Sequence, residues 1–224
     1  MHAAIRAQQP VAVCSSDSDY EARIEAGLIG YEYINPVAGY KGDQYFNDWA
    51  LGELTLKNGV TIRNIYLRYD RYMDALLWLR KSDYKAGVLS GKVVSGFKLV
   101  ADKLRPVASF YQMKVPLPAL GLKEVYLQSL VSGNYALYVY RNVNITSTNA
   151  DVLDDNTRYF LAYAGNIYPV SLRRHSLLSL PVIQKTDMKS ILRSTSVPTI
   201  NNNENGLIRA ITLYNAKAVT PPPK

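Results

Sequence analysis

The stretch from Leu54 to Asp70, LTLKNGVTIRNIYLRYD, decides the fold. Apolar and polar residues alternate on both sides of Asn58-Gly59, a pattern typical of a β-hairpin. A two-residue turn would mix apolar and polar side chains on each face of the hairpin. We therefore predict a three-residue loop, Lys57 to Gly59, with Gly59 in the left-handed conformation of a bulge. This loop pairs Leu54 with Ile62 and Leu56 with Val60.

The alternation changes phase after Asn64. Beyond this residue one face carries Ile65, Leu67 and Tyr69, and the opposite face carries Tyr66, Arg68 and Asp70. Two explanations fit the change: a bulge near Asn64, or burial of both faces of the strand.

Seven further runs have the length and alternation of strands, and Gly, Pro, Asn and Asp clusters separate them at hairpin spacings. They are residues 75–80, 93–99, 108–115, 123–129, 135–142, 158–164 and 167–170. After Pro169 the spacing of apolar residues becomes helical. The first helix is predicted to stop at Pro181, the second to be capped by Thr186 and the third by Asn202 or Asn203.

These patterns predict an α+β fold, in which an antiparallel β-meander is followed by three short C-terminal helices. The meander would form an open barrel or a strongly curved sheet. We expect a single domain over residues 43–217, with its β part at 45–170 and its helical part at 171–217. Residues 1–42 are predicted to be a flexible lead-in that includes the remnant of an export signal, and residues 218–224 a frayed tail.

Composition narrows the class of protein. The 224 residues include a single cysteine, Cys14, so neither an intrachain disulfide nor a cysteine-based zinc site is possible. No apolar run approaches the roughly 18 residues of a transmembrane helix. The net charge is +8, and nine basic but only two acidic residues follow Thr157. A basic region of this kind attracts nucleic acid, anionic lipid or acidic polysaccharide, or is simply a solvated face.

The N-terminal residues have two interpretations. MHAAIRAQQPVAV is too polar for a complete signal peptide, but Ala7-Gln8 resembles the junction left after such a peptide is removed. In the second interpretation, VAVCSSDSD is a lipoprotein signature with Cys14 as the lipidated residue.

The residues available for catalysis are few. The only histidines are His2 and His175, and no common catalytic or nucleotide-binding motif is present. The aspartates of NADVLDDN do not follow an EF-hand pattern. We therefore expect no cofactor and no metal site, and favour a protein without catalysis. The alternative is an enzyme with an unrecognised carboxylate site, for example Glu53 with Asp70.

Two segments carry side chains suited to binding. YLRYDRY interleaves Tyr66, Tyr69 and Tyr72 with Arg68 and Arg71, which together suit stacking on bases or sugars. The alternative is ordinary cross-strand packing, because neighbouring residues of a strand face opposite sides.

The second segment, SLRRHSLLSL, carries Arg173 and Arg174 on a basic amphipathic helix that would lie on anionic lipid. In the alternative interpretation its leucines dock on the sheet.

The pattern YFNDWALGELTLKNGVTIRNIYLRYDRYMDALLW resembles uncharacterised secreted or cell-envelope proteins of Bacteroidetes bacteria, and the C-terminal helices are similar to the closing helices of the same family. The resemblance spans residues 45–216 and implies export and a β-rich body, but no activity. We therefore expect an exported, periplasmic or envelope-associated protein that serves as a structural or binding module. Its partner would be another envelope protein, anionic lipid or polysaccharide. Nucleic-acid binding through the basic C-terminal third remains an alternative that we do not favour.

Overall fold

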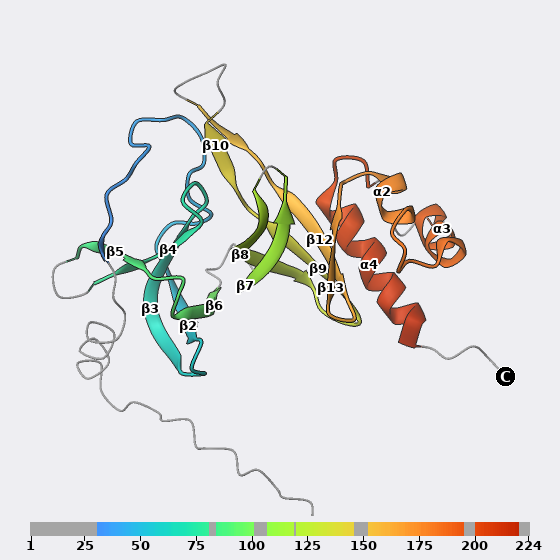
Figure 1. Cartoon of the computed structure of the whole chain (residues 1–224), viewed down its shortest axis with the longest axis horizontal. Coiled ribbons are helices and arrows are strands. Elements are labelled where there is room, and N and C mark those ends of the chain that lie inside the picture. Colours follow the sequence, from blue (N-terminus) through green and yellow to red (C-terminus); the bar gives the residue numbers. More distant parts are fainter. Residues whose placement is uncertain are drawn as a thin grey trace, which may run out of the picture.

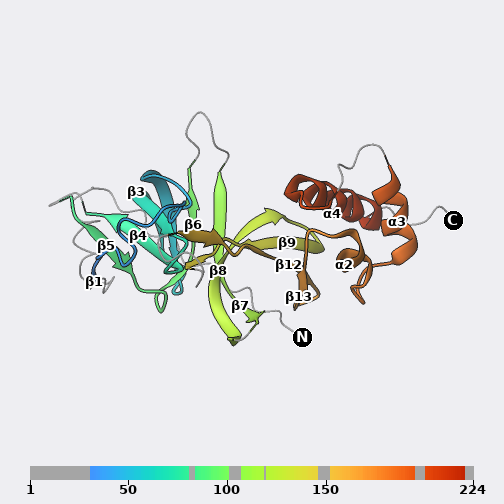
Figure 2. The same ribbon diagram turned by 90° about the horizontal axis from the view of Figure 1, so that it is seen from above.

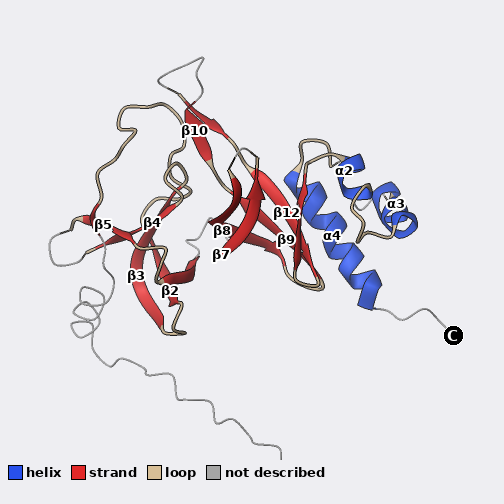
Figure 3. Cartoon of the chain, in the orientation of Figure 1, coloured by secondary structure: helices blue, strands red, loops and turns tan. Residues whose placement is uncertain are grey.

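A computed structural model describes residues 31–80, 84–100, 107–118, 120–145, 152–194 and 200–219 (Figure 1). Antiparallel strands make up the largest part of these residues, and three helices follow at the C-terminal end (Figure 3). The strands are β1 (Tyr31–Glu32), β2 (Ala50–Leu56), β3 (Thr61–Asp70), β4 (Ala75–Leu79), β5 (Ala86–Leu89), β6 (Val94–Leu99), β7 (Ala108–Leu117), β8 (Gly121–Val131), β9 (Tyr135–Tyr140), β10 (Val143–Ile145), β11 (Leu153–Asp155), β12 (Arg158–Tyr163) and β13 (Asn166–Val170).

Eleven of the described strands form one sheet, in the order β1-β5-β4-β3-β2-β6-β7-β8-β9-β12-β13, while β10 and β11 form a separate hairpin. The sheet departs from the predicted meander at β6, which does not pair with β5 but crosses to the far side of β2. It also departs at β1, which pairs with β5, and at β12, which pairs with β9. The edge strands β1 and β13 do not pair with each other, so the described sheet is not closed into a barrel.

The hairpin at Leu54 has the predicted register. Leu54 pairs with Ile62, and the amide of Leu56 donates to the carbonyl of Val60 at 2.8 Å. Gly59 is left-handed, with φ +87°. The predicted bulge is also confirmed, because Gly52 pairs with Ile65 while Glu53 pairs with Arg63, which leaves Asn64 as the extra residue at φ 59°.

A cluster of aromatic rings curls the sheet. Tyr69 of β3 lies 5.1 Å from Phe110 of β7 and 6.3 Å from Tyr126 of β8, measured between ring centroids. Phe97 of β6 stacks on Phe110 at 4.6 Å. Four strand-to-strand steps separate β3 from β8 in the sheet, which in a flat sheet would place them about 19 Å apart. The sheet must therefore curve around these rings, which form the core of its inner face.

The three described helices are α2 (Arg174–Leu178), α3 (Lys185–Arg193) and α4 (Glu204–Val219). Asn203 caps α4, because its side-chain oxygen accepts a hydrogen bond from the amide of Gly206 at 3.3 Å. The predicted cap at Thr186 is wrong. Helix α3 begins at Lys185, and the residue in the N-cap position, Gln184, makes no side-chain cap. The amide of Gln184 donates to the hydroxyl of Tyr214 at 2.8 Å.

The helices pack at one end of the molecule, beside β9, β12 and β13 (Figure 2). Leu177, Met188 and Leu207 are fully buried against the strand residues Leu137 and Leu161. The leucines of α2 therefore dock on the protein itself, as the second interpretation of SLRRHSLLSL expected.

Polar contacts fix α4 on the sheet. The guanidinium of Arg141 pairs with both carboxylate oxygens of Glu204 at 2.8 Å, and the hydroxyl of Tyr159 donates to the same carboxylate at 2.9 Å. Further along α4, the side-chain amide of Asn215 bonds both the amide and the carbonyl of Tyr135, at 2.9 and 2.8 Å. Asn215 thus occupies the place of a neighbouring strand at the start of β9.

The lead-in predicted for residues 1–42 is described only from Tyr31 onward, where β1 pairs with β5 and Val37 is buried. The predicted domain boundaries stay a prediction, and the tail lies largely outside the described residues.

Candidate functional site

The YLRYDRY segment is divided between the two faces of β3 and the turn that follows. Tyr66 and Arg68 point to the outer face of the sheet, away from the aromatic core. Tyr69 is fully buried, and its hydroxyl donates to Asp74 at 2.7 Å. Arg71 and Tyr72 lie in the turn after β3. The structure therefore brings together only Tyr66 and Arg68 of the five residues predicted to form one binding surface.

Exposed apolar side chains in β2 and β3, and next to the ends of β6 and β7, extend this outer surface. Leu51 of β2 pairs with Tyr66 of β3, and its carbonyl accepts the amide of Val100 at 2.8 Å. Val107 precedes Ala108, the residue that pairs with Leu99, so it lies beside Val100. Each of the four side chains is between 40% and 56% exposed. They form a continuous apolar row across β3, β2, β6 and β7.

An aromatic and cationic platform continues the row. The guanidinium carbon of Arg68 lies 4.4 Å from the ring centroid of Tyr45 and 5.1 Å from that of Trp49. Arg68 also pairs with Asp48 at 3.1 Å, but the Asp48 side chain is almost wholly exposed, so this ion pair is weak. The two rings attract the guanidinium by about 1 kcal/mol each. We call the surface formed by Tyr45, Trp49, Leu51, Tyr66, Arg68, Val100 and Val107 the outer sheet face.

Charged residues of both signs border the row on the side away from the platform. Glu53 pairs with Arg63 at 3.2 Å and with Lys98 at 3.7 Å. Because Glu53 is held by two cations on the outside of the sheet, it is not poised as a catalytic acid.

Asp70, the other carboxylate of the proposed acid pair, is fully buried. Its two oxygens accept hydrogen bonds from the hydroxyl of Tyr33, the side chain of Gln44 and the amides of Tyr72 and Met73, at 2.7 to 3.0 Å. These bonds hold the lead-in and the turn after β3 together. Asp70 therefore has a structural role and is closed to substrate.

Arg71 is held in a similar way. Its guanidinium donates to the carbonyl of Asp43 and pairs with Asp155 of β11, both at 3.2 Å. Its carbonyl accepts the side-chain amide of Asn142 at 2.9 Å. Arg71 thus joins the lead-in to the β10–β11 hairpin, and only a small part of its side chain is accessible.

The carboxyl group of Asp74 has a raised pKa. Burial raises the pKa of Asp74 from its ordinary value of 3.8 to about 7, although hydrogen bonds from Tyr69 and the amide of Tyr126 partly oppose the rise. Burial also raises the pKa of Tyr69, Tyr126 and Tyr140 around it. Asp74 adopts a left-handed backbone, with φ 51°. A carboxyl group of this kind can serve as an acid or base, or can simply link the turn after β3 to β8.

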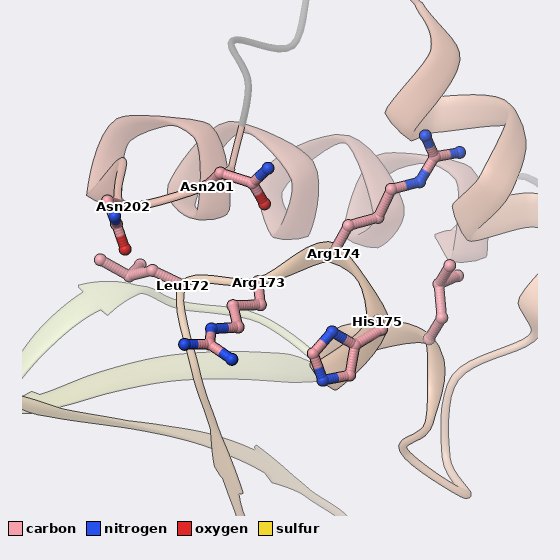
Figure 4. A pocket seen from close by; sticks show the side chains of 7 residues that line it. Leu172, Arg173, Arg174, His175, Asn201 and Asn202 are labelled. Carbon is pink, nitrogen blue, oxygen red and sulfur yellow. The ribbon is translucent and has the colours of Figure 1, made fainter.

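Arg173 and Arg174 lie at a second location, a recess of about 600 Å³ where the chain passes from β13 into α2 (Figure 4). His175, Asn201 and Asn202 also line it, with Leu172 and Leu178 as its apolar part. This basic recess lies at the helical end, remote from the outer sheet face in the order of the strands.

Other predicted groups lie outside the described residues or form no site within them. Cys14 and Asp151 are not described. In the described segments, no three His, Cys, Asp or Glu side chains gather as a metal site requires. None of the helices described is long and apolar enough to cross a bilayer.

No protein-family model matches the chain, and neither a curated protein nor a solved structure is similar to it. The candidate sites rest on their geometry alone. Sequence reasoning missed five residues of the outer sheet face: Tyr45, Trp49, Leu51, Val100 and Val107. The first three lie within the quoted pattern. The exposure of Leu51 could have been predicted, because residues two apart in a strand share a face and Glu53 lies on the polar face.

Proposed function

We propose that this protein is an exported, non-catalytic binding module of the cell envelope, and that it binds another envelope protein through its outer sheet face. The observation that carries the proposal is the apolar row of Tyr66, Leu51, Val100 and Val107 beside the Arg68 platform. Soluble proteins rarely expose so many adjoining apolar side chains without a use for them. Export is the part of the proposal that rests on the sequence resemblance.

The chemistry of the face favours a protein partner. Tyr, Trp and Arg are the residues most enriched at the energetic centres of protein interfaces, and the face offers Tyr66, Trp49 and Arg68 together. Its aliphatic side chains are Leu51, Val100 and Val107, and its charged border carries both signs. An anionic lipid surface would favour an excess of cations beside the apolar side chains, whereas the border of this face carries both signs. A saccharide would make little use of the aliphatic row.

Site-specific photo-crosslinking in cells of the native organism tests the proposal. A photoreactive phenylalanine derivative replaces Tyr66 in one strain and Leu122 in a control strain, since Leu122 is an exposed leucine of β8 outside the face. We expect one discrete protein adduct from position 66. The adduct should fall at least tenfold when Leu51→Glu is added, and should be unchanged by Leu122→Glu.

Three results would contradict the proposal. Absence of an adduct at position 66, or an adduct that is insensitive to Leu51→Glu, would show that the face has no bound protein. A heterogeneous adduct that is removed by polysaccharide-degrading enzymes would identify a saccharide instead. Circular dichroism of the purified Leu51→Glu variant controls for folding.

A further inference from the structure

The basic recess has unneutralised positive charge. Arg173 and Arg174 are exposed, and no ion pair joins either of them to an acidic group of the described chain. The two acidic residues of the described helical part are engaged elsewhere, because Asp187 pairs with Lys217 at 2.5 Å and Glu204 with Arg141 at 2.8 Å. Among the described residues, no acidic side chain lines the recess. An anion that enters it therefore meets cations without having to displace a carboxylate.

The walls of the recess are fixed in position. The amide of Asn202 donates to the carbonyl of Leu172 at 3.1 Å, which ties the segment before α4 to the segment after β13. Asn202 is left-handed, with φ 54°, and the next residue, Asn203, caps α4. On the opposite wall the amide of Ser171 donates to the hydroxyl of Ser176 at 3.0 Å. The recess is thus formed before any ligand binds, which lowers the entropic cost of binding.

The two arginines do not act as a pair on one group. The side chains of Arg173 and His175 lie on the same side of the turn, whereas Arg174 extends away from them (Figure 4). Arg173 is therefore the guanidinium that can contact a ligand together with His175. Its planar fork suits a bidentate contact with a carboxylate or a phosphate.

The remaining lining indicates what carries the anionic group. Asn201 and Asn202 have exposed side-chain amides, which can donate to and accept from hydroxyl groups. Leu172 and Leu178 offer an apolar surface beside them. A volume of about 600 Å³ lies in the usual range of small-molecule sites. A ring with hydroxyl groups and one oxyanion uses all three kinds of contact.

We propose that the basic recess binds an acidic sugar, with Arg173 holding its carboxylate or phosphate group and the asparagine amides contacting its hydroxyls. This site is independent of the proposed protein-binding face, so either proposal can fail alone.

Titration of the ¹⁵N-labelled full chain, followed by amide chemical shifts, tests the inference. The probes are glucuronate, glucose 6-phosphate, neutral glucose and inorganic phosphate at constant ionic strength. We expect saturable shifts at Leu172 and Asn202 with glucuronate, glucose 6-phosphate or both, and at least tenfold weaker binding of glucose and of phosphate. Tighter binding of glucuronate would identify a carboxylate as the preferred anionic group, and tighter binding of glucose 6-phosphate would identify a phosphate.

Three variants sharpen the test. Arg173→Gln should weaken binding of the acidic sugar at least tenfold, Arg174→Gln by less, and Lys189→Gln should leave binding unchanged, because Lys189 is an exposed lysine of α3 outside the recess. Equal losses in all three variants would mean general charge attraction and would overturn the inference. So would the absence of saturable shifts, or tighter binding of an oligonucleotide that displaces the sugar. The amide spectrum of each variant reports its folding.

Discussion

Asp74 shows how one residue can make the stability of this fold depend on pH. The folded protein holds the pKa of Asp74 near 7, above its ordinary value of 3.8, because its carboxyl is buried beside Tyr69 and Tyr126. The unfolded chain therefore loses this proton at a lower pH than the folded chain. Between about pH 4 and pH 7 the folded state binds more protons, so its free energy of unfolding falls as pH rises.

We expect Asp74→Asn to remove this dependence. Asparagine tolerates the left-handed backbone, and its side-chain oxygen can still accept from the Tyr69 hydroxyl and the Tyr126 amide. At pH 8 the variant should be more stable than the natural protein by about 1–2 kcal/mol, and the gap should shrink towards pH 5. Urea unfolding at pH 5 and pH 8 measures both values.

Asp48→Asn is the control, because the Asp48 side chain is exposed. A stability difference between Asp74→Asn and the natural protein that is the same at both pH values, or that grows towards pH 5, would contradict this account of Asp74.

At the scale of elements, the attachment of α4 to the sheet depends on polar contacts as well as on apolar burial. Arg141 and Glu204 are about one-fifth to one-quarter exposed and make two bonds to each other, with Tyr159 as a third partner. Asp187 and Lys217 join α3 to α4 through a single ion pair with a more exposed lysine. The ion pair that joins α4 to the sheet is therefore more buried than the ion pair that joins α4 to α3.

Two double-mutant cycles, one for each ion pair, compare the coupling free energies. For Arg141→Gln with Glu204→Gln we expect a coupling free energy of about 1–3 kcal/mol, because removing one partner leaves the other buried without its countercharge. For Lys217→Gln with Asp187→Asn we expect less than about 1 kcal/mol. Urea unfolding of all single and double variants gives both values. Equal coupling in the two cycles would contradict the anchoring role of Glu204.

Short-range patterns predicted individual elements well. The register of the hairpin followed from pairing Leu54 with Ile62, and the bulge from the phase change at Asn64. The short strand β5 was missed, because Ala86-Gly87-Val88-Leu89 has no alternation of polar and apolar residues. Thr186 was a plausible cap by composition, but α3 begins at Lys185 and no side chain caps it.

At the scale of the whole molecule, the order of the strands could not be predicted from local patterns. The crossing of β6 to β2 brings Val100 and Val107 beside Leu51, although about fifty residues of sequence separate them. Tyr66 and Arg68 were predicted as binding residues, but Val100 and Val107 share the outer sheet face with them only because of this crossing. Arg173 and Arg174 were predicted as basic residues, whereas the recess depends on the later segment that includes Asn202.

The central claim is that this is an exported binding protein, and its most direct test is the location of the protein in its native cell. Cell fractionation, combined with mass spectrometry of the mature N-terminus, measures location and processing together. We expect the protein in the envelope fraction, with a mature start near Gln8 or a lipidated Cys14. An unprocessed protein in the cytosol would contradict the claim, and the basic C-terminal third would then become the first place to look for a partner.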